Sequence, residues 1–544
     1  MNILKYLPLI AFVFAFQSCT KDLQSLNDNP AGFAELDPSY QFTKVQTGLA
    51  GDREDVWRYD LLVASPMVQH LAGAWGVQAG GMYQIMEKAY WTGHWEATYP
   101  RELKNIQDIV DKTADVPEQA NIHAAARILR VFIFAKLTDL YGDIPYSEAI
   151  KGFTEGKFLP KYDKQEDIYM DFFKELEEAV TSFDETAGPF NGDIFFNGNV
   201  AQWKKFGNSL RLRLGFRIVN VNPSESKKQV EAAIAGGVMT SNADIAMTKH
   251  MALSYSDGEL RGNGRSQVFK LDVVSSNFRL VNTLVDFMSS RKDPRLNIYS
   301  RAYYGVGIIG VSRDIQDITH LIEPLGMKPG GLPWVEAVNY GILKDSDDQP
   351  IINPADGNPY NVDFMTSLRQ PSEYVSALDA PSFHFTYAEV ELLKAEAALR
   401  GWAGLSDAKT HFNKGLEASC DMMSLYPGAP AIPAAAINEL KASYSPFPTG
   451  FEAAMDAIHG QMWVNFFLNG VEAYSNYRRT GYPSQLIPFK SLAWYTSETD
   501  GVMPKRFFYP TAEFIQNKTS YQEAIDRLGG KDDWLKPVWW DTNN

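Results

Sequence analysis

The stretch TYAEVELLKAEAALRGWAGLSDAKTHFNKGLEAS, residues 386–419, has the pattern of two helices joined by a short loop. Thr386 and Glu389 have the T-x-x-E spacing of a capping box, which satisfies free backbone N–H groups at a helix start. Gly401 stands where a helix commonly ends, because glycine adopts the left-handed conformation easily. Ser406 is the expected cap of the second helix. The stretch therefore predicts a helical hairpin.

The second helix of this hairpin has the spacing of a tetratricopeptide unit. Ala408, Phe412 and Gly415 follow its A-x₃-F-x₂-small pattern, in which small residues let the paired helices approach. A second candidate pair covers residues 203–219 and 224–234. Such a pair cannot bury its apolar face alone and must stack on neighbours. Because the units are irregular, the predicted fold class is mainly α, a tetratricopeptide-like helical hairpin scaffold rather than a regular repeat array.

Residues 296–380 differ from the helical blocks on either side. They are rich in Gly, Pro and Asn and lack sustained helical periodicity. Loops of this length in a compact protein tend to be functional or disordered, and the aromatic residues here argue against disorder. We therefore predict one helical domain, residues 19–544, with a long loop-rich insertion at about 296–380 that contains short strands.

The N-terminal residues MNILKYLPLIAFVFAFQSC predict export. Ten residues without a charged or strongly polar side chain follow Lys5, and as a helix they rise about 15 Å, half of a bilayer core. That is the length of a signal-peptide hydrophobic region. Because Cys19 directly follows this region and the small residue Ser18, residues 1–18 resemble a lipoprotein signal and Cys19 is the predicted lipidation site. An ordinary secretory signal with an incidental cysteine is the alternative.

The overall charge and the cysteine count restrict the function further. The chain has 66 acidic and 51 basic residues, whereas nucleic-acid binding requires clustered positive charge. With Cys19 acylated, Cys420 has no partner for an internal disulfide. An exported protein of this size does not need one, because its hydrophobic core is large.

No pattern typical of an enzyme occurs in the sequence. H-E-x-x-H, G-x-S-x-G and P-loop motifs are absent, and most of the eight scattered histidines are expected on helix surfaces. Three aspartates in KDSDDQP, residues 344–350, lack the glycine and distal Glu of an EF-hand, so a solvated acidic loop is favoured over a calcium site. We predict no catalytic residue, metal or cofactor. An exported glycosidase is a remaining alternative, since its two carboxylates need not be close in sequence.

Six stretches of the sequence form a recognisable series: WEATYPRELKNIQDIV (95–110), AARILRVFIFAKLTDLYGDIPYSEA (125–149), WKKFGNSLRLRLGFRI (203–218), RKDPRL (291–296), EVELLKAEAALRG (389–401) and KRFFYPTAEFIQN (505–517). In the same order, they resemble motifs of the SusD/RagB family of outer-membrane nutrient-binding lipoproteins, in particular its second SusD-like subgroup. The signal departs from the usual lipobox at Phe16 and Gln17, and the insertion contains no family motif.

The resemblance implies a helical scaffold that is anchored to the outer membrane by lipid and exposed at the cell surface. It also implies a partner, a SusC-like TonB-dependent transporter, and a glycan ligand that the lipoprotein passes to it. A peptide-capturing member of the same family, or a tetratricopeptide-like envelope scaffold protein without a nutrient ligand, is the alternative.

Two aromatic, glycine-rich stretches are the candidate ligand-binding regions. One is AWGVQAGGMY, residues 74–83, with Trp75 and Tyr83; the other is the insertion, with Tyr303, Tyr304 and Trp334. Sugar rings have apolar C–H faces that stack on aromatic rings, and loop aromatics have little core to fill. The alternative for each of these rings is that it packs a loop onto the helical body.

Overall fold

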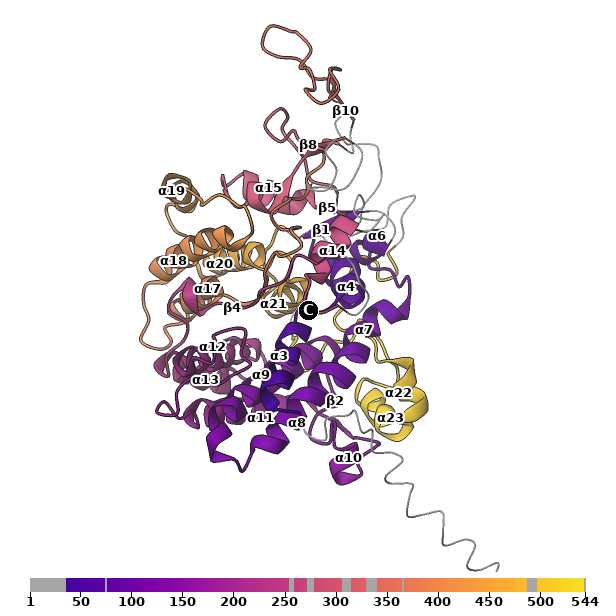
Figure 1. Cartoon of the computed structure of the whole chain (residues 1–544), viewed down its shortest axis with the longest axis vertical. Coiled ribbons are helices and arrows are strands. Elements are labelled where there is room, and N and C mark those ends of the chain that lie inside the picture. The colour runs from indigo at the N-terminus through magenta and orange to yellow at the C-terminus, as the bar shows by residue number, and fades with distance from the viewer. Residues whose placement is uncertain are drawn as a thin grey trace, which may run out of the picture.

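The computed structural model of the chain describes residues 36–73, 76–253, 259–271, 278–305, 315–328, 340–363, 366–486 and 497–542. Helices form an elongated body, and a narrower part projects from one end (Figure 1). None of the helices within these ranges is both long and apolar enough to cross a membrane. The predicted signal peptide, residues 1–18, and Cys19 lie outside the described residues.

The first part of the chain forms short helical segments around one β-strand. They are α3 (Pro38–Gly48), α4 (Arg53–Val56), the π-helical η2 (Trp57–Ala64), α5 (Ser65–Met67), β1 (Leu71–Gly73), α6 (Gly76–Gly81), α7 (Lys88–Thr98) and the π-helical η3 (Tyr99–Leu103). In α7, Trp91 and Trp95 are buried, as their spacing of four residues predicts.

A stack of longer helices follows. It comprises α8 (Lys104–Thr113), η4 (Pro117–Gln119), α9 (Ala120–Tyr141), β2 (Ile144–Pro145), α10 (Gly152–Glu155), β3 (Tyr162–Asp163), α11 (Gln165–Thr181), α12 (Val200–Arg217), α13 (Pro223–Ala235), η5 (Asn242–Asp244) and β4 (Ala246–Thr248). Helix α9 lies among α8, α11, α12 and α21, which explains why its sequence is apolar nearly all round. Gly142, with φ of 81°, ends it.

The hairpin predicted at residues 386–419 is present as α17 (Tyr387–Leu399) and α18 (Ala408–Asp421). The Thr386 side chain accepts a hydrogen bond from the Glu389 backbone N–H at 3.2 Å, and Gly401 has φ of 65°. The cap of the second helix is Asp407 rather than Ser406. A Cβ atom on Gly415 would lie 2.8 Å from Leu392 Cγ, so the two helices touch at the small residue, as the tetratricopeptide-like pattern predicts.

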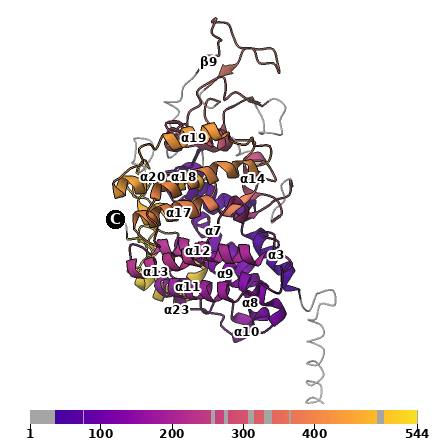
Figure 2. The ribbon, with the colours of Figure 1, turned by 90° about the vertical axis from the view of Figure 1, so that its left-hand side faces the viewer.

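Further helices extend this stack and close the chain. They are η8 (Met422–Leu425), α19 (Ala434–Ala442), α20 (Phe451–Asn465), α21 (Gly470–Thr480), α22 (Thr511–Gln516) and α23 (Lys518–Arg527). Figure 2 shows α17, α18, α19 and α20 layered above α12, α13 and α11. The mainly α fold class is therefore confirmed.

The region between α13 and α17 contains short elements. They are α14 (Gly264–Leu271), β5 (Phe278–Leu280), α15 (Asn282–Ser289), α16 (Leu296–Tyr299), β6 (Ser300–Arg301), β7 (Tyr303–Tyr304), β8 (Gln316–Asp317), β9 (Gly341–Ile342), β10 (Asn361–Val362), β11 (Gln370–Pro371) and β12 (Ser382–Phe385). The strands pair antiparallel in twos: β1–β5, β2–β3, β4–β12, β6–β11, β7–β8 and β9–β10. Between α16 and β11 the strands and loops form the projecting end (Figure 1).

One large hydrophobic cluster extends through the body, from Phe42 in α3 to Trp540 near the C-terminus. The insertion has a separate, smaller cluster formed by Ala302, Ile318, Leu343, Tyr360 and Val362. The C-terminal segment returns to the middle of the body, where Trp540 Nε1 donates a hydrogen bond to Asp139 Oδ1 at 2.8 Å.

Candidate functional site

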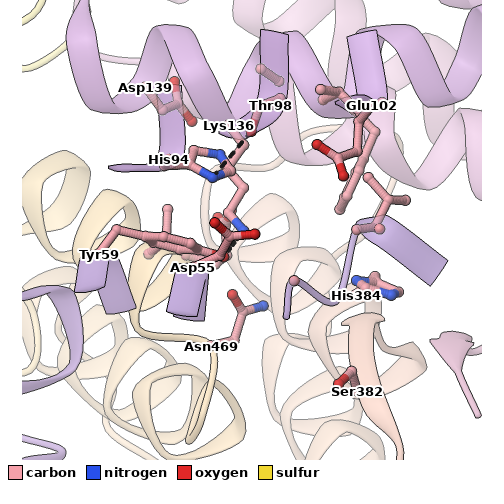
Figure 3. A pocket seen from close by; sticks show the side chains of 18 of the residues that line it. Asp55, Tyr59, His94, Thr98, Glu102, Lys136, Asp139, Ser382, His384 and Asn469 are labelled. Carbon is pink, nitrogen blue, oxygen red and sulfur yellow. Dashed lines mark hydrogen bonds between the residues drawn. The ribbon is translucent and has the colours of Figure 1, made fainter. Parts of the chain in front are cut away.

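A polar cavity lies inside the helical body (Figure 3). Side chains from α4, η2, α7, η3, α9, α12, β12 and the loop before α21 line it. The volume that the centres of water-sized molecules can occupy is about 70 Å³, which is enough for a few waters but too small for a glycan chain.

Arg213 and Arg217 of α12 line the cavity, and both form ion pairs with carboxylates. Arg213 donates two hydrogen bonds to the carboxylate of Glu389, at 2.6 and 2.7 Å. Arg217 pairs with Glu472, and its Nε lies 3.1 Å from Asp139 Oδ2. Burial alone would raise the pKa of Glu472, but Arg213 and Arg217 beside it hold that pKa below its usual value. These ion pairs join α12 to α9, α17 and α21.

Lys136 and Glu102, which also line the cavity, have weaker pairing. Lys136 Nζ lies 3.3 Å from the Tyr59 hydroxyl and 5.0 Å from the centre of its ring. Burial lowers the pKa of Lys136 to about 8, with the Arg265 guanidinium adding to that effect. Burial also raises the pKa of Glu102 to about 8, although Arg101 counteracts part of this shift. In Figure 3, Lys136 and Asp55 lie beside the Tyr59 ring, and Glu102 is on the other side of the cavity.

The prediction that most of the eight histidines lie on helix surfaces is wrong. Five of the eight histidines are buried, and their rings form hydrogen bonds inside the body. His70 Nε2, for example, lies 2.9 Å from the Trp463 carbonyl oxygen, and His459 Nε2 lies 3.1 Å from Glu396. The buried set is His70, His94, His250, His384 and His459. His94, His384 and the paired arginines line the polar cavity, so the cavity is part of an internal bonding network that joins the helices.

The predicted ligand-binding aromatics lie in different surroundings. Tyr83, with 1% of its surface exposed, belongs to the main hydrophobic cluster, whereas Tyr304 packs against the smaller cluster of the insertion. Tyr303 is 7% exposed, and its hydroxyl bonds to Glu373. Burial therefore favours the alternative, a packing role, for Tyr83 and Tyr303. Trp75 and Trp334 lie outside the described residues and stay predictions.

Tyr304 is the half-buried member of the predicted set and lies in the insertion. Its ring meets Tyr360 edge to face, with centroids 4.9 Å apart. On β6 of the same region, Arg301 pairs with Asp317 at 2.8 Å, and its guanidinium lies 5.6 Å from the centre of the Tyr374 ring. Aromatic faces beside such charged hydrogen-bonding groups suit a hydroxyl-rich ligand. Sequence reasoning missed Tyr374 and Arg301, although the same criterion, an aromatic residue in the insertion, would have selected Tyr374.

The acidic turn at 344–350 is solvent-exposed, and its carboxylates are used within the turn. Asp345 Oδ1 accepts hydrogen bonds from the backbone N–H groups of Asp347 and Gln349, both at 2.9 Å. Lys344 pairs with Asp348 at 2.8 Å. Within the described ranges, no three His, Cys, Asp or Glu side chains converge in a way that suits a metal ion.

Comparison with known proteins establishes the family. A model of the second SusD-like family, described as starch-binding and associating with the outer membrane, matches residues 30–510. The chain belongs to this SusD-like family. The resemblance found in the six sequence motifs is therefore confirmed, and so is the association of the family with the outer membrane.

Solved structures agree with this assignment. The SusD-like chain is 34% identical to a chitin-binding protein, with a TM-score of 0.76, and the match covers 93% of this chain and all of the other. It is 31% identical to a SusD-like protein of the Bacteroidetes, with a TM-score of 0.82 and the same coverage. A SusD homologue from Bacteroides uniformis, at 22% identity, has the same fold, with a TM-score of 0.71 over 94% of this chain and all of the other. No curated protein matches the chain.

Proposed function

We propose that this SusD-like chain is a cell-surface lipoprotein that captures a glycan and delivers it to a SusC-like TonB-dependent transporter in the outer membrane. The proposal rests on membership of the SusD-like family, whose model matches residues 30–510. Because a relative with 34% identity is a chitin-binding protein, oligosaccharides of N-acetylglucosamine are the first ligands to test. Cys19 is the proposed lipid anchor, and the chain acts by binding, without catalysis.

Trp75, Trp334 and Tyr304 are the proposed stacking residues. Stacking on one aromatic ring contributes about 1–3 kcal/mol, by analogy with nucleic-acid bases, so each truncation should weaken binding about tenfold or more. Tyr374 and Arg301 are added to the proposed site because they lie in the same insertion as Tyr304. Tyr83 and Tyr303 are buried, so we propose a packing role for both rather than stacking on the ligand.

The test is isothermal titration calorimetry on the mature chain that begins after Cys19 and therefore carries no lipid. Chitohexaose, maltohexaose and a tryptic digest of casein are titrated separately. We expect one of the two glycans to bind and the peptide mixture to give no heat of binding. Binding of the peptides alone would replace the glycan proposal with the peptide-capturing alternative. An absence of binding to all three would favour an envelope scaffold without a nutrient ligand.

The position of the site is tested with the glycan that binds. Trp75→Ala, Trp334→Ala and Tyr304→Ala are compared with Tyr40→Ala, which removes a tyrosine that is 69% exposed on α3, outside the insertion. Circular dichroism confirms folding of each variant. We expect the first three to lose affinity and Tyr40→Ala to keep it. Wild-type affinity in all three would place the glycan elsewhere on the surface.

A further inference from the structure

One lysine that lines the polar cavity has no carboxylate as a partner. Lys136 of α9 lines the cavity together with four arginines of the described chain: Arg101, Arg213, Arg217 and Arg265. Each of these arginines forms an ion pair with a carboxylate. Lys136 forms none with any residue in the part of the chain that the structure describes. Because buried charges in proteins are normally paired, the Lys136 ammonium is available to a ligand of opposite charge.

The carboxylates that line the cavity are already used by arginines. They are Asp55, Glu102, Asp139 and Glu472. Arg101 pairs with the first two, and its Nε lies 3.7 Å from Glu102 Oε1. Arg217 pairs with the other two. Burial also raises the pKa of Glu102 to about 8, so this side chain is mostly uncharged at pH 7. None of the four therefore supplies the missing charge beside Lys136.

A histidine close to Lys136 has a ring nitrogen without a partner. His94 of α7 lines the same cavity and is 9% exposed. Its Nδ1 lies 3.3 Å from the Thr98 hydroxyl (Figure 3), whereas its Nε2 is buried and has no hydrogen-bond partner among the described residues. Burial lowers the pKa of His94 well below its usual value, and the Lys136 ammonium adds to this shift, so the ring is neutral. With Nδ1 accepting the Thr98 proton, Nε2 carries the ring proton and can donate it to a ligand.

Tyr59 of η2 holds Lys136 and His94 near each other. Lys136 Nζ donates to the Tyr59 hydroxyl at 3.3 Å, and the centres of the His94 and Tyr59 rings are 4.6 Å apart. Figure 3 shows the Lys136 side chain beside both rings. An ammonium group has three donors, so two remain after the bond to Tyr59. Three elements, η2, α7 and α9, thus bring unused donors together.

The other groups that act on Lys136 do not neutralise it. The Arg265 guanidinium lowers the pKa of Lys136 further, although Arg265 itself is paired with Asp60 at 2.8 Å. Asp60, Glu472 and Glu102 act in the opposite direction, but each of these carboxylates has an arginine as its partner. His384 of β12 adds no charge, because burial lowers its pKa well below the usual value.

We propose that the cavity binds a small monovalent anion, with chloride as the simplest case, against the Lys136 ammonium. His94 donates a second hydrogen bond to the anion from Nε2. The cavity has room for an ion of this size together with a few waters that complete its coordination. The bound anion would join η2, α7 and α9 inside the body, away from the proposed glycan site in the insertion.

The chemistry of the unused groups selects an anion over the other small occupants. A metal cation prefers several oxygen ligands, and beside Lys136 it would be repelled while the lining carboxylates remain bound to arginines. Water can accept hydrogen bonds from the ammonium group, but it supplies no negative charge. An anion satisfies both the charge of Lys136 and the donor of His94.

Anomalous X-ray diffraction tests the proposal directly. The mature chain that begins after Cys19 is purified and crystallised in sodium bromide, because bromide replaces chloride and scatters anomalously. We expect an anomalous peak within hydrogen-bonding distance of Lys136 Nζ and His94 Nε2. Lys136→Met should lose this peak. The control Lys44→Met, which removes an exposed lysine from α3, should keep it.

Thermal melts provide the matching measurement in solution. Chloride is replaced stepwise by the bulkier glutamate at constant ionic strength. General salt effects act on all variants alike, so the readout is the chloride-dependent shift of the wild type minus that of Lys136→Met. At a chloride concentration ten times the dissociation constant, this difference should be about 1 °C for a chain of this size. Lys44→Met should shift like wild type.

Two results would overturn the proposal. One is wild-type crystals grown in bromide in which the cavity contains waters alone, a result that does not depend on whether Lys136→Met folds. The other is a chloride-dependent shift that is equal in the wild type and in Lys136→Met. The glycan titrations concern the insertion and not this cavity, so failure of the anion proposal and failure of the proposed function are distinguishable.

Discussion

Replacing Arg217 by methionine tests whether the internal bonding network stabilises the fold. Arg217 is 2% exposed and pairs with both Asp139 and Glu472. Methionine keeps much of the side-chain length but removes the charge. In the variant, Glu472 still has Arg213 at 3.6 Å, whereas the carboxylate of Asp139 keeps two neutral donors, the Tyr169 hydroxyl and Trp540 Nε1. The charge of Arg478 still acts on Asp139 and offsets part of the loss.

The expected cost follows from the buried carboxylate that loses its partner. Removing one member of a buried ion pair costs about 3–5 kcal/mol, because the other charge stays away from water. Unfolding entropy of about 2.1 cal/mol/K per residue over roughly 500 residues gives about 1 kcal/mol per degree, so the melting temperature should fall by about 3–5 °C. Burial already raises the pKa of Asp139, with Arg217 counteracting it. Without Arg217 that pKa rises further.

A higher folded-state pKa for Asp139 also predicts how the loss depends on pH. As pH rises above the unfolded value, the unfolded chain releases the Asp139 proton while the folded variant retains it, so the unfolded state is increasingly favoured. The loss should therefore be larger at pH 8 than at pH 5. Differential scanning calorimetry at both values measures it. The control is Lys112→Met, which breaks an exposed i,i+4 pair with Asp108 and should cost about 0.5 kcal/mol or less. Equal losses in the two variants would refute the argument that the buried network matters.

Three further predictions concern the anchor, the hairpin and the cavity. Cys19→Ala should move the protein from the membrane fraction to the soluble fraction; fractionation like wild type would reject acylation at this residue. Gly415→Leu should lower the free energy of unfolding by about 1–3 kcal/mol, because an added Cβ would lie 2.8 Å from Leu392 Cγ. Lys414→Leu, on the exposed side of the same helix, should leave the melting temperature nearly unchanged. Glu102→Gln should raise the melting temperature relative to wild type, and by more as the pH rises from 4.5 to 8. The reason is that the pKa of Glu102 is raised to about 8 in the folded protein, so the unfolded chain loses this proton first and becomes favoured. A difference in melting temperature that stays constant across this range would contradict the prediction.

The helical scaffold could be predicted from sequence because its signals are local. The cap at Thr386, the glycine at 401 and the small residue at 415 each act within one or two helical turns, and the structure has all three. Ser406 was the wrong cap because Asp407, one residue later, is an equally good one. The pairing of Glu389 with Arg213, 176 residues apart, has no such local signal.

The burial of candidate site residues could not be predicted from the sequence, because burial depends on the whole fold. Tyr83 lies in a glycine-rich stretch, as an exposed loop aromatic would, yet its ring is in the main hydrophobic cluster. Four of the five buried histidines show the same limit, since they bond to groups that are distant in sequence; Trp463, for example, is 393 residues from His70. Periodicity can show which face of a helix is apolar but not which polar residues the neighbouring helices cover.

The return of the C-terminal segment to α9 has a consequence for biosynthesis. Trp540 bonds to Asp139 across 401 residues of chain, so this part of the body cannot close until residue 540 has been synthesised. Until then, Asp139 and Arg217 lack the indole that contacts them, and this part of the body stays open. Chains that terminate before Trp540 should therefore be degraded by proteases faster than chains that contain it.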